Sequence, residues 1–127
     1  MDKQKILVIE DELEVAEIYK DLLVKAGFDV TIANSGNEGV SLAKQIKPQL
    51  IILDIMMPEM DGIEVLKRLK EDNETDLIPV IILTNVGVDH IQAEALSLGA
   101  VRYIVKTDVV YENFVAEVTN YINKNQG

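Results

Sequence analysis

The chain has 127 residues and a mass of 14.2 kDa, which fits one domain of ordinary size. It contains no cysteine, so a disulfide scaffold, a thiolate metal site and a cysteine nucleophile are excluded. Its 12 basic and 22 acidic residues give a formal net charge of −10, which disfavours direct binding to nucleic acid. No apolar run reaches the roughly 20 residues that span a bilayer, so we expect no membrane insertion and a cytoplasmic protein.

Along the chain, two kinds of apolar pattern alternate. Short segments rich in β-branched residues predict strands, and segments with apolar residues every three or four positions predict helices. The predicted strands are residues 6–9, 28–32, 50–53, 80–83 and 101–105. The predicted helices between and after them are residues 15–26, 40–46, 63–69, 91–98 and 114–122.

Residues typical of helix ends mark where several predicted helices start and stop. An N-cap residue stands three positions before a Glu or Gln at four predicted helix starts, with Asp11, Ser35, Asp61 and Asp89 as the caps. Gly27 and Gly99 follow helical segments and are predicted to end them in the left-handed conformation.

This alternation predicts an α/β fold with a five-stranded parallel sheet and helices on both faces, because crossover connections are right-handed. Segment 28–32 alternates apolar and polar residues, and segment 101–105 carries Arg102, so both are predicted as edge strands. The simplest strand order is then 2-1-3-4-5. In such doubly wound sheets ligands bind where the order reverses, here between the carboxyl ends of the first and third strands.

Three acidic residues are predicted to meet at that crevice. Glu10 and Asp11 follow the first strand, and Asp54 follows the third. Converging carboxylates repel one another unless protons or a cation are bound, and oxygen ligands of this kind suit Mg²⁺. An acidic residue after a strand also commonly caps the next helix, and for Asp11 alone that structural interpretation is equally open.

Thr84 and Lys106 end the fourth and fifth strands and are predicted to lie at the same edge. A hydroxyl group and an ammonium group beside Asp54 suit a phosphoryl group on that carboxylate, because Lys106 and a metal ion share its charge. Asp54 is therefore the candidate nucleophile, forming an acyl phosphate.

These residues resemble a known family. The segments Ile9-Glu10-Asp11, Asp54-Ile55-Met56-Met57-Pro58-Glu59-Met60-Asp61-Gly62, Leu83-Thr84 and Val105-Lys106 are similar to the motifs of response-regulator receiver domains of two-component systems. The resemblance covers nearly the whole chain. It implies one flavodoxin-like (βα)5 receiver domain over residues 1–127, with a core of about residues 4–124 and no output domain.

The resemblance also implies roles for individual residues. Asp54 would accept the phosphoryl group. Asp11, Asp54 and the backbone carbonyl of Met56 would bind Mg²⁺ (or Mn²⁺), with Glu10 acting through a water molecule. Lys106 would pair with the phosphoryl group and Thr84 would move toward it. Tyr103 would move inward as the aromatic switch.

The implied function is a phosphorylatable signalling switch that takes its phosphoryl group from a histidine kinase or a histidine phosphotransfer protein. It would catalyse only its own phosphorylation and dephosphorylation. The surface of the fourth helix, fifth strand and fifth helix would then control a downstream protein or homodimerisation. Two residues depart from the family pattern: Thr107 replaces the usual proline after Lys106, which in the family follows a cis peptide, and Asn85 stands where a small residue is usual.

Two other functions remain open from the sequence. One is a receiver-fold interaction module that works without phosphorylation, although such modules usually lack one of the site residues that this chain keeps. The other is a small α/β enzyme or flavin carrier. A flavin phosphate would need a loop rich in Ser, Thr and Gly after the first strand, whereas residues 10–14 are mostly acidic.

Overall fold

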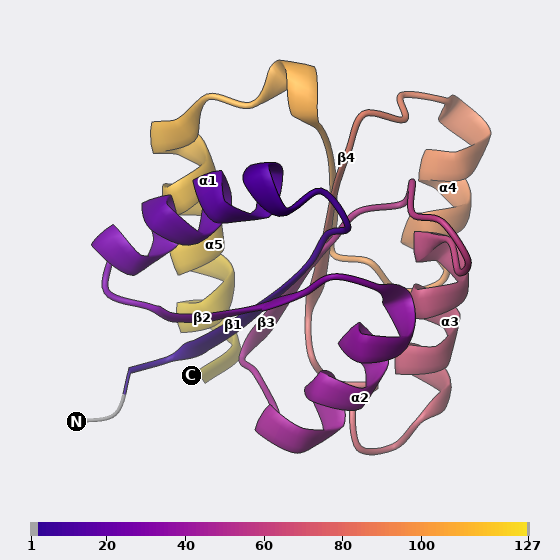
Figure 1. Cartoon of the computed structure of the whole chain (residues 1–127), viewed down its shortest axis with the longest axis horizontal. Coiled ribbons are helices and arrows are strands. Elements are labelled where there is room, and N and C mark those ends of the chain that lie inside the picture. Colours follow the sequence, from indigo (N-terminus) through magenta and orange to yellow (C-terminus); the bar gives the residue numbers. More distant parts are fainter. Residues whose placement is uncertain (1–2, 127) are drawn as a thin grey trace.

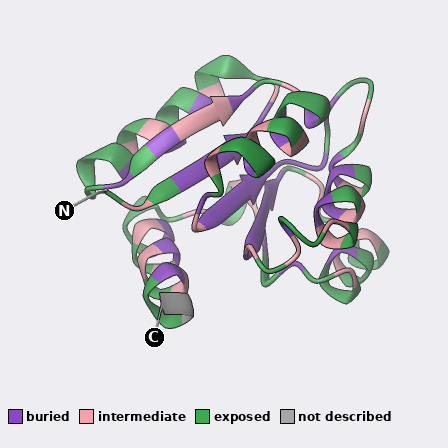
Figure 2. Ribbon diagram, turned by 90° about the horizontal axis from the view of Figure 1, so that it is seen from below, coloured by how far each residue is buried: buried purple, intermediate pink, exposed green. Residues whose placement is uncertain are grey.

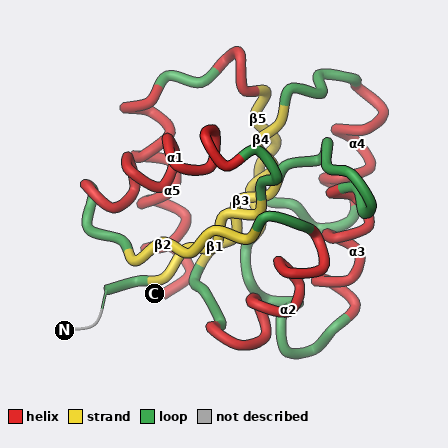
Figure 3. Tube along the Cα trace, viewed as in Figure 1, coloured by secondary structure: helices red, strands yellow, loops and turns green. Residues whose placement is uncertain are grey.

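The computed structural model describes residues 3–126 of the chain. Strands and helices alternate throughout this range (Figures 1 and 3). The strands are β1 (Lys5–Ile9), β2 (Asp29–Ala33), β3 (Leu50–Leu53), β4 (Val80–Thr84) and β5 (Arg102–Val105). The helices are α1 (Leu13–Lys25), α2 (Gly36–Ile46), α3 (Gly62–Glu71), α4 (Asp89–Ser97) and α5 (Tyr111–Gln126), with a 3₁₀ turn at Lys106–Asp108.

All five strands belong to one parallel sheet in the order β2-β1-β3-β4-β5, as the sequence predicts. Four strands differ from their predicted ranges by one residue: β1 starts at Lys5, β2 runs from Asp29 to Ala33, β4 ends at Thr84, and β5 starts at Arg102. The three inner strands β1, β3 and β4 are buried almost along their whole length (Figure 2). Their continuous apolar sequence therefore reflects cover on both faces of the sheet.

Two apolar cores lie on opposite faces of the sheet. One face packs against α1 and α5, and the other packs against α2, α3 and α4 (Figure 1). Neighbouring residues of a strand alternate between the two cores, so that Ile6 and Val8 contact the first and Leu7 and Ile9 the second. Because neighbouring strands are parallel, the carboxyl ends of β1, β3, β4 and β5 lie side by side at one edge of the sheet.

Two of the four predicted helix caps are confirmed. The Ser35 hydroxyl accepts the amide of Glu38 at 3.2 Å, and the Asp61 carboxylate accepts the amide of Glu64 at 3.0 Å. The prediction is wrong for the other two. Glu12 holds the N-cap position of α1, because Asp11 lies one residue earlier, and Asp89 is already inside α4, with Val88 as its cap.

The helix ends at Gly27 and Gly99 are confirmed. These glycines follow the cap residues of α1 and α4 and have φ values of +102° and +111°. Both lie at the amino edge of the sheet, opposite the predicted crevice, because α1 and α4 run from the carboxyl edge to the amino edge. Among the described residues, no helix is both long enough and apolar enough to cross a membrane.

Candidate functional site

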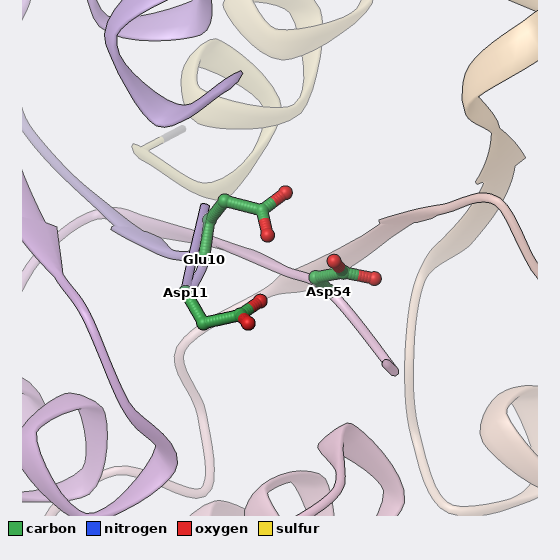
Figure 4. A group of neighbouring side chains, drawn as sticks. All are labelled: Glu10, Asp11 and Asp54. Carbon is green, nitrogen blue, oxygen red and sulfur yellow. The ribbon is translucent and has the colours of Figure 1, made fainter. Parts of the chain in front are cut away.

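Three carboxyl groups come together at the carboxyl edge of the sheet. Glu10 and Asp11 directly follow β1, and Asp54 directly follows β3, the neighbouring strand. Figure 4 shows their side chains extending into the same space, and each offers an oxygen within 4.8 Å of the other two. The three acidic residues therefore meet at the sheet edge where the strand order reverses, as the sequence predicted.

Asp11 has an oxygen that the protein leaves unpaired. Among the described side chains of residues 3–124, Asp11 Oδ1 is the buried oxygen without a hydrogen-bond partner. A buried carboxylate oxygen is costly unless something binds it. Its neighbours in the cluster are two further carboxyl groups, so a cation is a suitable partner for this oxygen. The donor set, three carboxylates with hard oxygen atoms, fits a divalent cation such as Mg²⁺.

Lys106 supplies a positive charge to two of the three acids. Its Nζ lies 2.5 Å from Glu10 Oε1 and 3.3 Å from Asp54 Oδ2. The lysine follows β5, so the fold brings it to residues 96 and 52 positions away in the sequence. Burial would lower the pKa of Lys106, but its hydrogen bond to Glu10 and the charge of Asp54 outweigh that effect and raise it. The ammonium group therefore stays charged.

Glu10 is the acid whose protonation responds most to this environment. Its side chain is buried, with 3% of its surface exposed. The pKa of Glu10 is raised from 4.5 to about 7, mainly by burial; the hydrogen bond from Lys106 opposes this rise, and the adjacent Asp54 adds to it. Without a cation, Glu10 therefore gains or loses its proton near neutral pH.

Asp54 begins the loop between β3 and α3, which hydrogen bonds hold in place. The amide of Met56 donates to Asp54 Oδ1 at 3.1 Å, while Oδ2 contacts Lys106. The amide of Gly62, the first residue of α3, donates to the carbonyl of Ile55 at 2.8 Å and closes the loop between them. The side chain of Met56 is 63% exposed, so its backbone, and not its thioether, is the part that the site orders.

Thr84 and Tyr103 lie at the same edge but do not touch the acidic group. Thr84 is the last residue of β4, is fully buried, and its hydroxyl oxygen accepts the amide of Val86 at 3.4 Å. The Tyr103 hydroxyl donates to the carbonyl of the same Val86 at 2.6 Å. Tyr103 is thus already packed inward, 4% exposed, so its predicted inward movement on activation stays a prediction that this state does not test.

The loop after Lys106 shows how the chain accommodates Thr107. The described residues contain no cis peptide bond, so the Lys106–Thr107 bond is trans. Residues Lys106–Asp108 form a 3₁₀ turn, closed by a hydrogen bond from the amide of Val109 to the Lys106 carbonyl. With threonine at this position the chain forms a trans bond and a 3₁₀ turn, and Lys106 reaches Glu10 and Asp54.

Sequence reasoning missed two contributors. The backbone of Val86 links Thr84 to Tyr103 through two hydrogen bonds. Val86 is an apolar residue two positions after a strand, and nothing in the sequence indicates that its backbone makes these bonds. From the sequence, Gly62 was interpreted as a residue that shapes the turn into the third helix. Its contact with the backbone of Asp54 is visible only in the folded chain.

Known proteins are similar to this chain in sequence and in fold. The model of the response regulator receiver domain matches residues 6–123. Among curated proteins, the chain is 40% identical over 105 residues to the transcriptional regulatory protein YdfI of Bacillus subtilis, covering 80% of this chain and 47% of that protein. It is 38% identical over 102 residues to the DNA-binding dual master transcriptional regulator RpaA of Synechocystis, covering 80% and 42%.

The chain spans less than half the length of these relatives. RpaA is described as DNA-binding, so the expectation that this chain does not bind nucleic acid directly gains no support from its relatives.

Solved structures of receiver domains have the same fold as this chain. The receiver domain of the Francisella response regulator 1452 has a TM-score of 0.88 and 30% identity, covering 96% of this chain and 98% of that one. A CheY-like receiver protein from Methanospirillum hungatei has a TM-score of 0.91, with 98% of both chains covered; at 22% identity it shows the fold alone.

Proposed function

Because the chain belongs to the response regulator receiver domain family, we propose that it is a phosphorylatable signalling switch in which Asp54 accepts a phosphoryl group from a phosphohistidine. The donor is a histidine kinase or a histidine phosphotransfer protein, and the switch works in the cytoplasm. The observation that carries this proposal is the pairing of Asp54 Oδ2 with Lys106 beside the unpartnered Oδ1 of Asp11.

In the proposed transfer, an oxygen of the Asp54 carboxylate attacks the phosphorus atom of the donor. An O–P bond forms, the P–N bond to the imidazole breaks, and the leaving nitrogen takes up a proton. Lys106 is close enough to Asp54 to stabilise negative charge on the oxygens of the transferred group. Hydrolysis by water later releases phosphate and restores the carboxylate, so the protein processes only its own phosphoryl group.

The proposal includes Mg²⁺ (or Mn²⁺). Asp11, Asp54 and the Met56 carbonyl would hold it, with Glu10 acting through water, and when bound it neutralises charge on the phosphoryl group. The group of three carboxylates and the orphaned Asp11 oxygen support this assignment. The fit depends on oxygen donors alone, as expected for a hard cation.

The proposed output surface is formed by α4, β5 and α5. Thr84 and Tyr103 both bond to Val86, in the loop that leads into α4, so a shift of Thr84 toward a phosphoryl group acts on this surface. The apolar side chains of Val88, Leu96 and Val101 are exposed there. A downstream protein or a second copy of the chain would bind this face. Sedimentation with and without beryllofluoride tests the dimer, and a pull-down under the same two conditions tests the downstream protein; unchanged results in both count against this surface.

The decisive experiment is phosphorylation by a small acyl phosphate. The protein is incubated with acetyl phosphate and MgCl₂, and its intact mass is measured. We expect the gain of one phosphoryl group, which is lost when Mg²⁺ is chelated and in Asp54→Ala. Asp29→Ala, an exposed aspartate at the amino edge, is the matched control and should gain the group normally. An unchanged mass of the wild-type protein would favour a phosphorylation-independent interaction module instead.

A further inference from the structure

Gly62 makes an unusually close contact with the backbone that carries Asp54. A Cβ atom on Gly62 would lie 2.3 Å from the carbonyl oxygen of Asp54 and 2.6 Å from Cα of Ile55. Both are backbone atoms, so no side-chain rotation relieves the overlap. Among the described glycines only Gly27 and Gly99 have a positive φ, so position 62 requires the missing Cβ and not an unusual backbone conformation.

This contact lies at the base of the loop that holds the site. The Gly62 amide donates to the Ile55 carbonyl, one residue beyond Asp54, and the Met56 amide donates to Asp54 Oδ1. Asp54 and Met56, two of the three residues proposed to hold the cation, therefore flank the backbone against which α3 packs. Any residue larger than glycine has to push this backbone away from the start of α3.

We propose that Gly62 is a positioning residue, whose missing side chain lets α3 pack directly against residues 54 and 55 and so fixes the Asp54 carboxylate relative to Asp11 and Lys106. This inference rests on the proposed function, because the geometry that it fixes is that of the phosphoryl-accepting site. Gly62 itself touches neither the cation nor the phosphoryl group. Its effect is transmitted through the backbone of Asp54.

The test compares Gly62→Ala with Gly27→Ala. The second variant places a Cβ on a residue with φ +102° at the amino edge, with no atom within 4 Å of the added carbon. Both variants are expected to unfold more easily, but only Gly62→Ala alters the site. Calorimetric titration with MgCl₂ should show binding about 10- to 100-fold weaker in Gly62→Ala, the range typical for residues that orient metal ligands, and unchanged affinity in Gly27→Ala.

A second measurement does not depend on the metal. Hydrogen exchange at the Met56 amide reports its bond to Asp54 Oδ1, and should be faster in Gly62→Ala than in Gly27→Ala at equal global stability. If Gly62→Ala is largely unfolded, trimethylamine N-oxide restores the folded state for both measurements.

The outcomes separate the two proposals. Wild-type Mg²⁺ affinity and Met56 protection in Gly62→Ala would overturn the positioning role and leave the proposed function intact. Equal weakening in both variants would also overturn it, since the loss would then follow global stability. Absence of Mg²⁺ binding and of phosphorylation in the wild-type protein would count against the proposed function, while faster Met56 exchange in Gly62→Ala would still support the backbone coupling.

Discussion

The hydroxyl of Tyr103 donates a 2.6 Å hydrogen bond to the backbone carbonyl of Val86. The amide of the same residue donates to Thr84, so the last residue of β4 and a residue of β5 are joined through one residue of the loop before α4. This link connects the carboxyl edge of the sheet with the surface of α4. It also gives the buried Tyr103 ring a fixed polar partner, as buried tyrosines generally require.

Removing this bond should weaken the fold measurably. Tyr103→Phe keeps the buried ring but leaves the Val86 carbonyl without its donor, so we expect the free energy of unfolding to fall by about 1 kcal/mol. Urea denaturation followed by circular dichroism measures this. Tyr111→Phe, at a half-exposed position, is the control and should be neutral. Equal stability of Tyr103→Phe and the wild-type protein would show that the bond contributes nothing.

Removing one acid should change the response to magnesium. In Asp11→Asn the number of neighbouring negative charges falls, so the metal-free variant should be more stable than the metal-free wild type. Mg²⁺ at about 100 times its dissociation constant should stabilise the wild type by about 2.7 kcal/mol, and should stabilise the variant less. Thermal unfolding with and without MgCl₂ measures both effects, with the exposed Asp29→Asn as control. An identical magnesium-induced shift in Asp11→Asn and the wild type would exclude Asp11 as a ligand.

The raised pKa of Glu10 predicts a pH dependence of stability in the metal-free protein. Glu10 titrates near 4.5 when unfolded and near 7 when folded, because of burial and the adjacent Asp54. Between these values the folded state binds more protons than the unfolded state, so stability falls as pH rises from about 4.5 to about 7. Below this window both states are protonated, and above it both are ionised.

Urea denaturation in EDTA at a series of pH values measures this decline. Glu10→Gln cannot titrate, so its stability should change less over the same range. The difference between the two curves isolates Glu10 from the other carboxylates of the chain. A difference that stays constant from pH 4.5 to 7 would contradict the raised pKa.

Short sequence patterns correctly predicted those strands and helix starts that depend only on residues close together in the chain. The apolar runs at 50–53 and 80–83 predicted buried strands, and Ser35 and Asp61 predicted the starts of α2 and α3. The predictions failed at Asp11 and Asp89, because the N-cap of α1 lies one residue later and that of α4 one residue earlier than predicted. Asp11 satisfies the N-cap pattern, but its carboxyl group instead joins the acidic cluster that β1 and β3 form together.

The sequence by itself determined which segments form strands and helices, though not their exact ends, the strand order, and which side chains follow the carboxyl ends of the strands. These properties follow from hydrophobic periodicity and from the handedness of crossovers, which act along the chain. Only the tertiary structure decided that Lys106 pairs with Glu10 more closely than with Asp54, that Asp11 keeps an unpaired oxygen, and that Gly62 packs against the backbone of Asp54. The physical reason is that charge pairing and close packing depend on separations of a few ångströms between residues far apart in sequence, which no local pattern encodes.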